Sequence, residues 1–201
     1  MSKLDGIVMT DIIDRKLHEW TQGKSITDAR ISIYYKVRDI PYAVIPDFNG
    51  PEQYVDMLRL NRGSCTPKHL LMCKMYQRLG LEVLYAVYPF RWDAFEAIYP
   101  PRLRRLAQAM PLSHHLACKV DINGNLILVD ATLDLGLQKL GLPVTQKWDG
   151  HSDTNLAMNP CDEEQLYHPL EAHLMQPRTL DEKSLSFYNA LNSWLDEIRH
   201  Q

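Results

Sequence analysis

The chain has 201 residues, 45% of them hydrophobic and 23% charged, and its formal net charge at pH 7 is -3. A chain of this length and composition is typical of a single globular domain with a well-buried core, here residues 1–201. The weak negative charge excludes the basic field of a nucleic-acid-binding protein, and no stretch is long and apolar enough for a membrane span, so we expect neither partner.

The N-terminal part of the chain predicts helices. Apolar residues recur at helical spacing in the first twenty residues, and Gly23 follows as a stop. Ser25 or Thr27 can cap a second helix, which should end before Pro41 because the residue preceding a proline is pushed out of the α region. We expect helices over about 5–21, from about 26 to 40, and over 51–60.

The segment from Gly63 to Gly80 predicts the helix around which the site is organised. Pro67 lies in the first turn, apolar residues follow at helical spacing, and Gly80 closes the pattern. Cys65 therefore lies at or beside a helix N-terminus, where free N–H groups and the helix dipole favour the thiolate. Free cysteines are more often buried core residues, so a nucleophilic role for Cys65 requires a histidine and an acid nearby.

A hairpin is the best-defined element of the second half. Residues 81–88 predict a strand, and 90–111 predict two helical pieces interrupted at Pro100-Pro101. Strands over 115–122 and 125–131 then flank Asn123-Gly124, the preferred type I′ turn. The turn sets the register, with Ile122 opposite Asn125, Val120 opposite Ile127 and Cys118 opposite Val129.

The same register assigns the hairpin side chains to two faces. Alternate residues from Leu116 to Ala131 form a strongly apolar face, which should be core. The opposite face carries His115 and Asp130 as diagonal neighbours, about 7–8 Å apart along the backbone and within reach of a hydrogen bond. Ala117, opposite Asp130, is small and leaves room for the imidazole.

The remaining chain predicts weaker elements. We expect short strands over 142–145 and 155–158, with a turn over 148–151 between them. Residues 160–178 read as irregular. Thr179 to Glu182 has the pattern of a capping box for a closing helix that runs to about residue 199.

Cys65, His115 and Asp130 together suit thiol acyl transfer. The histidine would take the thiol proton and later protonate the leaving group, while the acid would hold the imidazole tautomer. The backbone N–H of Cys65 could supply one oxyanion donor. Ser64, His69 and Tyr42 are the further candidates for oxyanion or supporting contacts, although packing is an equally simple role for His69 and Tyr42.

The motifs resemble the transglutaminase-like cysteine hydrolase superfamily. The resemblance rests on Gly63-Ser64-Cys65 opening a helix, His115 beginning a strand, and Leu128-Val129-Asp130-Ala131-Thr132, and it covers about residues 26–135. It implies a papain-like α+β fold, with N-terminal helices and the catalytic helix packed on an antiparallel sheet. It also implies reaction at the carbonyl of a peptide, protein or small amide, without metal or organic cofactor. Ala117 and Lys119 replace the family's usual aromatic residue and acid.

Alternatives remain at this stage. Arg62-Gly63-Ser64-Cys65 is close to the R-G-G-x-C pattern of the arylamine N-acetyltransferases, which use coenzyme A, although the second glycine is missing. The fold could also serve as a binding module with an idle triad. Cys65, His69 and Cys73 share one helix face, but three ligands spread over about 12 Å of helix cannot all reach one metal ion. The cysteines form no C-x-x-C pair, which suits reduced thiols in the cytoplasm.

Overall fold

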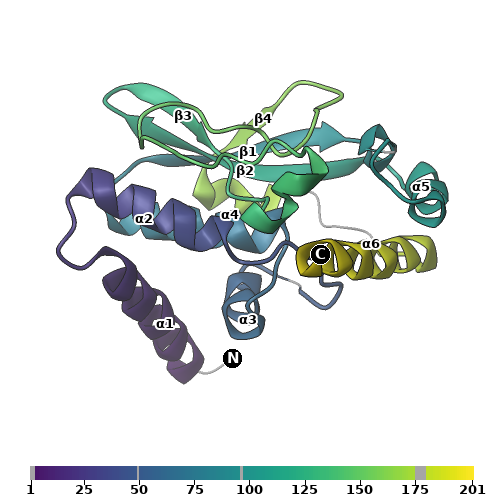
Figure 1. The fold of residues 1–201 in the computed structure, drawn as a ribbon. Helices are drawn as coiled ribbons and strands as arrows, with labels where there is room; N and C mark the ends of the chain where they lie inside the picture. The colour runs from purple at the N-terminus through teal and green to yellow at the C-terminus, as the bar shows by residue number, and fades with distance from the viewer. Residues whose placement is uncertain (1–2, 49, 96, 175–179) are drawn as a thin grey trace.

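The computed structural model describes residues 3–48, 50–95, 97–174 and 180–201 (Figure 1). An antiparallel sheet forms one layer, and helices α2, α4 and α6 lie on one side of it. The helices are α1 (Lys3–Thr21), α2 (Ile26–Arg38), α3 (Gln53–Leu60), α4 (Cys65–Arg78), α5 (Pro101–Gln108) and α6 (Glu182–His200). The strands are β1 (Val83–Phe90), β2 (Ser113–Ile122), β3 (Asn125–Val129) and β4 (Gln165–Tyr167), and short 3₁₀ helices are η1 (Trp92–Phe95), η2 (Leu135–Leu140) and η3 (Pro169–Leu174).

This architecture is of the α+β class that the sequence predicts, with N-terminal helices followed by an antiparallel sheet. Helices come first, and the helix that begins at Cys65 packs against the hairpin strand β2. Among the described residues, no helix is both long and apolar enough to cross a bilayer.

The sheet has the strand order β3-β2-β1-β4, and every pairing is antiparallel. The predicted hairpin register is confirmed, since Cys118 pairs with Val129 and Ile122 with Asn125. Asn123 and Gly124 have φ values of 56° and 83°, as a type I′ turn requires. β1 begins two residues later than predicted and pairs with β2 along its whole length.

The main core lies between one face of the sheet and the helices α2 and α4. Alternate residues of the hairpin contribute to it, as expected from the register: Leu116, Cys118, Val120, Ile122, Val129 and Ala131. A second apolar cluster joins α6, α5 and η1, with Trp92 and Phe187 among its buried members. The opposite face of the sheet carries a small cluster around Tyr88 and Ala117.

Two predicted strands are absent, and one strand was missed. Residues 142–145 and 155–158 form loops, whereas the irregular stretch 160–178 contains β4 and η3 in its described part. The carbonyl of Thr145 accepts from Arg38 on α2, and the Thr154 N–H donates to the Leu128 carbonyl on the outer edge of β3. Short apolar runs do not distinguish a strand from a packed loop, because both bury alternate side chains.

The closing helix begins at a different cap from the one predicted. Asp181 is the N-cap of α6, and its carboxylate accepts the Ser184 N–H at 2.8 Å. Thr179, the expected capping residue, lies outside the described residues. Near its middle α6 is tied to the loop before α3, where Asn192 exchanges two hydrogen bonds with the backbone of Val44.

Candidate active site

Cys65 is the first residue of α4, as the sequence pattern indicates. Ser64 is the N-cap in extended conformation, but its side chain makes no capping hydrogen bond. Gly63 is bridged to Tyr42, and a Cβ at Gly63 would lie 2.6 Å from the side chain of Met57. Glycine is therefore required for the chain to pass this point into the helix. The thiol of Cys65 is placed where free backbone N–H groups and the helix dipole favour negative charge.

His115 and Asp130 form a buried pair. The Nε2 atom of His115 lies 2.8 Å from Oδ2 of Asp130, and neither side chain is exposed to solvent. The same carboxylate accepts the backbone N–H groups of Thr132 at 3.0 Å and Ala157 at 2.8 Å. These bonds hold the carboxylate in place, and together with the positive charge of His115 they overcome the effect of burial, so the pKa of Asp130 lies far below its ordinary value.

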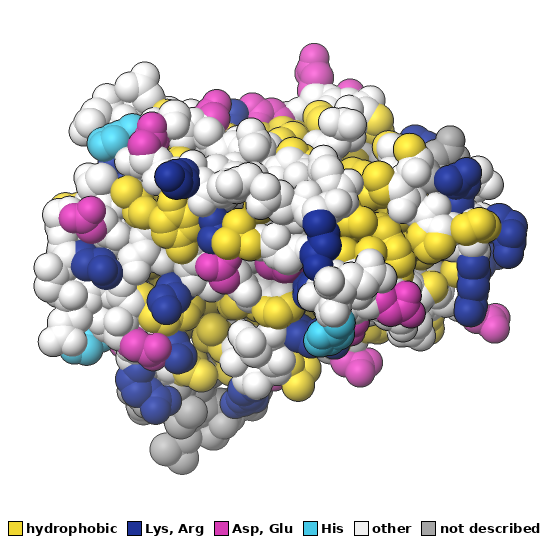
Figure 2. Space-filling view, in the orientation of Figure 1, with side chains coloured by type: hydrophobic (Ala, Val, Ile, Leu, Met, Phe, Trp, Pro, Cys, Tyr) yellow, Lys and Arg dark blue, Asp and Glu magenta, His cyan; other side chains and the backbone are white. Residues whose placement is uncertain are grey.

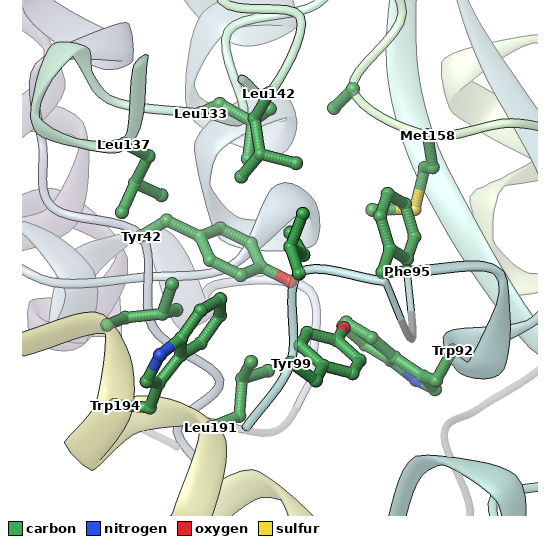
Figure 3. Close-up of a pocket in the computed structure, with 13 residues that line it drawn as sticks. Tyr42, Trp92, Phe95, Tyr99, Leu133, Leu137, Leu142, Met158, Leu191 and Trp194 are labelled. Carbon is green, nitrogen blue, oxygen red and sulfur yellow. The ribbon is translucent and has the colours of Figure 1, made fainter. Parts of the chain in front are cut away.

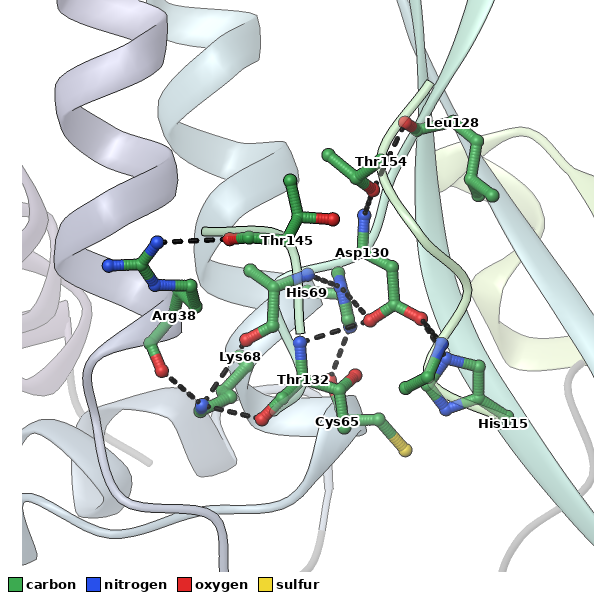
Figure 4. Close-up of polar contacts among 12 residues, drawn as sticks. Arg38, Cys65, Lys68, His69, His115, Leu128, Asp130, Thr132, Thr145 and Thr154 are labelled. Atoms are coloured by element: carbon green, nitrogen blue, oxygen red, sulfur yellow. Dashed lines mark hydrogen bonds and ion pairs between the residues drawn. The ribbon is translucent and has the colours of Figure 1, made fainter. Parts of the chain in front are cut away.

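The other ring nitrogen of His115 is turned to the cysteine. Nδ1 has no hydrogen-bond partner among the described residues, and the Cys65 side chain lies beside the ring (Figure 4). Burial raises the pKa of the Cys65 thiol, but attraction to His115 outweighs it and the pKa lies below the ordinary value. Burial lowers the pKa of His115, but the charge of Asp130 outweighs this and raises it to about 10. Both shifts act in the direction of a thiolate beside an imidazolium.

His69 connects the first residue of α4 to the segment that follows Asp130. Its Nδ1 lies 2.9 Å from the carbonyl oxygen of Cys65, and the N–H of Ala131 donates to its Nε2 at 2.9 Å. The second bond assigns the proton to Nδ1, so both ring nitrogens are occupied. Burial lowers the pKa of His69 to about 4, so the ring is neutral at physiological pH. The sequence predicts His69 as a supporting residue, and the fold brings it into contact with both segments.

Lys68 is a buried residue of the site that the sequence did not single out. Its ammonium donates to three backbone carbonyls, those of Arg38 at 2.9 Å, Ala131 at 3.2 Å and Thr132 at 2.7 Å. Burial lowers its pKa to about 7. The three bonds join α2 and α4 to the segment that follows Asp130. No signal in the sequence separates this lysine from an exposed one on the same helix.

Tyr42 is held by its backbone. Its N–H donates to Oδ2 of Asp134 at 2.8 Å, and its carbonyl accepts from Arg199 at 2.7 Å. Arg199 also pairs with Asp134 at 2.7 Å, so the end of α6 is attached to the loop that precedes the cysteine. The ring of Tyr42 lines an apolar cavity.

The other cysteines differ from Cys65. Cys73 and Cys118 are buried in the main core, and Cys161 is exposed. Burial, together with the neighbouring Cys118 thiol, raises the pKa of Cys73 well above its ordinary value. Among the described residues, no group of three or more His, Cys, Asp or Glu side chains is arranged to hold a metal ion.

Comparisons with known proteins concern the fold. No family and no curated protein matches the sequence. Among solved structures, the chain is similar to one from Cytophaga hutchinsonii described as a "putative cysteine protease", with 17% identity and a TM-score of 0.43 over 64% of this chain and 39% of that one. It is also similar to a structure described as "a TGase", with 13% identity and a TM-score of 0.46 over 67% of this chain and 34% of that one. The chain thus spans less than two fifths of the length of either structure.

Proposed function

We propose that the chain is a cysteine-dependent hydrolase or acyl transferase that acts on an amide or acyl carbonyl. The observation that carries the proposal is the spatial arrangement in which His115 lies between Asp130 and Cys65. The carboxylate holds Nε2 of the imidazole at 2.8 Å, and the ring's remaining nitrogen is left for a thiol at a helix N-terminus. This is the arrangement that nucleophilic catalysis by a thiol requires.

The reaction proceeds in two halves. The Cys65 thiolate attacks the carbonyl carbon, and the developing oxyanion is stabilised by backbone N–H groups at the start of α4. The imidazolium of His115 gives its proton to the leaving amine or alcohol, which leaves an acyl group on sulfur. Neutral His115 then takes a proton from water or another nucleophile, whose attack releases the acyl group and restores the thiolate. Asp130 stabilises the imidazolium throughout, and neither metal nor organic cofactor is needed.

The pH dependence of alkylation tests this chemistry. Iodoacetamide labelling of the cysteines, followed by peptide mass spectrometry, gives a rate for Cys65 and a reference rate for exposed Cys161 in the same sample. At pH 7 we expect Cys65 to react faster than Cys161, and His115→Ala to slow Cys65 by about thirty-fold, because an ordinary thiol is only a few per cent ionised there. His114→Ala is the matched control, since His114 is the exposed neighbour.

Two outcomes would favour the alternatives. If Cys65 reacts no faster than Cys161, or at the same rate with and without His115, the thiol and imidazole are uncoupled and a binding module with an idle triad is the better description. If Cys65 is primed and becomes acylated by an acyl-coenzyme A at low concentration, the arylamine N-acetyltransferase-like alternative gains over hydrolysis. Mass spectrometry of intact protein separates these cases, because an acyl group adds a defined mass to Cys65.

A further inference from the structure

An apolar cavity lies between the loop before α3, η1 and α6 (Figure 3). Its volume is about 40 Å³, room for roughly three water molecules at about 10–15 Å³ each. Its walls come from the loop before α3, from η1 and the turn after it, from the segment after Asp130, and from α6. Its labelled lining residues include Tyr42, Trp92, Leu133, Leu142 and Trp194.

Several residues that line the cavity are linked to Asp130 or to the segment before Cys65. Ala157 lines it, and the N–H of Ala157 donates to the same Asp130 oxygen that holds His115. Leu133 follows directly after Thr132, whose N–H also donates to Asp130. Tyr42 lines the cavity while its backbone is bridged to Gly63, two residues before Cys65. These wall residues are therefore linked to the triad by one hydrogen bond to Asp130, by three residues of chain after Asp130, and by the bridge to Gly63.

The cavity opens on an apolar part of the surface. Figure 2 shows hydrophobic side chains gathered on the face where α5 and α6 lie. At the cavity itself, Phe95, Ile98 and Trp194 are only partly buried. Such patches mark binding sites more often than structural defects. Ion pairs attach α6 to neighbouring segments, since Arg199 pairs with Asp134 and Arg62 with Asp196.

We infer that this cavity takes a short unbranched aliphatic acyl chain of the substrate whose carbonyl Cys65 attacks. The lining is almost wholly apolar, so a charged or amide side chain would lose its hydrogen bonds to water without replacement. The narrow volume admits a chain of a few carbons and excludes an aromatic ring system without displacement of the walls. The inference rests on the proposed function, since it names the acyl group of that reaction.

Ligand binding tests the cavity without turnover. In a Cys65→Ala protein, the tryptophan fluorescence is titrated with acetamide, butanamide and hexanamide, because Trp92 and Trp194 line the cavity. We expect affinity to rise about four-fold for each added methylene until the chain fills the cavity, which corresponds to ~0.8 kcal/mol per buried CH₂. Leu142→Phe, which narrows the cavity, should remove most of that increase. Leu126→Phe, an exposed leucine of β3 that does not line the cavity, is the matched control.

A second measurement separates the cavity from the chemistry. The rate of Cys65 acylation by acetyl, butanoyl and hexanoyl p-nitrophenyl esters should rise with chain length in the wild type and stay flat in Leu142→Phe. Equal affinity for all three amides would overturn the cavity inference even if Cys65 alkylation depends on His115. Chain-length-dependent amide binding alongside alkylation independent of His115 would retain the cavity as a site for an aliphatic ligand and remove the proposed reaction.

Discussion

The backbone N–H of Ala131 donates to Nε2 of His69 at 2.9 Å, while the opposite ring nitrogen bonds the carbonyl oxygen of Cys65. One neutral imidazole thus joins the first residue of the helix that carries the thiol to the residue directly after Asp130. Only the neutral form with its proton on Nδ1 makes both bonds, because a protonated ring cannot accept from Ala131. The relative placement of Cys65 and Asp130 therefore depends on the protonation state of His69.

A His69→Gln variant should lose its stability difference from the wild type as the pH falls. The pKa of His69 is about 4 in the folded protein and about 6.5 in an unfolded chain, so between these values the unfolded state binds more protons. The stability that neutral His69 contributes is complete above about pH 6.5 and is lost as the pH falls through about 4. Glutamine does not titrate, so the variant should lack this part of the pH dependence.

Urea unfolding of both proteins at several pH values measures the effect. The difference in free energy of unfolding between wild type and His69→Gln should shrink steadily from pH 6.5 to pH 4. His168→Gln, at an exposed position, should show no such change. A difference that stays constant over this range would mean that His69 does not hold the two segments through its neutral ring.

The pH profile of acyl turnover should differ from that of alkylation at high pH. Alkylation needs only the thiolate, so its rate rises through the lowered pKa of Cys65 and then stays level. Turnover also needs the proton of His115, so it should fall as the pH passes about 10, where the imidazolium is lost. Rates measured with iodoacetamide and with an aliphatic ester give the two profiles. Coincident profiles would contradict the role of His115 as proton donor.

Asp130→Asn should shift the acid side of both profiles to higher pH. The charge of Asp130 is the largest contribution that raises the pKa of His115, and asparagine keeps the shape of the side chain without that charge. With a lower pKa, His115 is less often protonated and stabilises the Cys65 thiolate less. Alkylation of Cys65 at pH 6 should therefore slow by about ten-fold or more. Asp153→Asn is the control, because it alters an exposed carboxylate. It should leave the pH profile of Cys65 alkylation unchanged.

Lys68→Met should destabilise the protein and slow the reaction of Cys65. Methionine keeps most of the apolar stem but leaves the carbonyls of Arg38, Ala131 and Thr132 without their donor, at a cost of about 3 kcal/mol. The segment after Asp130 would then move relative to α4, which weakens the contact of His115 with its acid. Circular dichroism in urea and iodoacetamide labelling measure the two effects.

An exposed lysine provides the control. Lys24→Met should change the free energy of unfolding by less than about 0.5 kcal/mol and leave Cys65 labelling unchanged. If Lys68→Met loses stability but keeps the full Cys65 rate, Lys68 supports the fold without positioning the reacting groups.

Local signals predicted the elements that carry the site. Pro67 and Gly80 delimited the helix that begins at Cys65, and Asn123-Gly124 fixed the hairpin register from which the contact between His115 and Asp130 was expected. These signals act over a few residues, because turn geometry and helix termini depend on neighbouring backbone angles. The predictions of strands over 142–145 and 155–158 were wrong, because no such signal bounded these segments and their hydrogen-bond partners lie far away in the chain.

The sequence by itself determined the α+β order of elements, the thiol at a helix N-terminus and the pairing of His115 with Asp130. Only the tertiary structure decided which ring nitrogen of His115 faces the thiol, that His69 and Lys68 fasten the helix to the segment after Asp130, and that α6 closes an apolar cavity next to it. The physical reason is range. Caps, turns and register follow from neighbouring residues, whereas the contacts of His69 with Ala131 and of Lys68 with Thr132 join residues 62 and 64 positions apart. The cavity brings α6 against a loop still further from it in the chain. Such contacts depend on how whole elements pack.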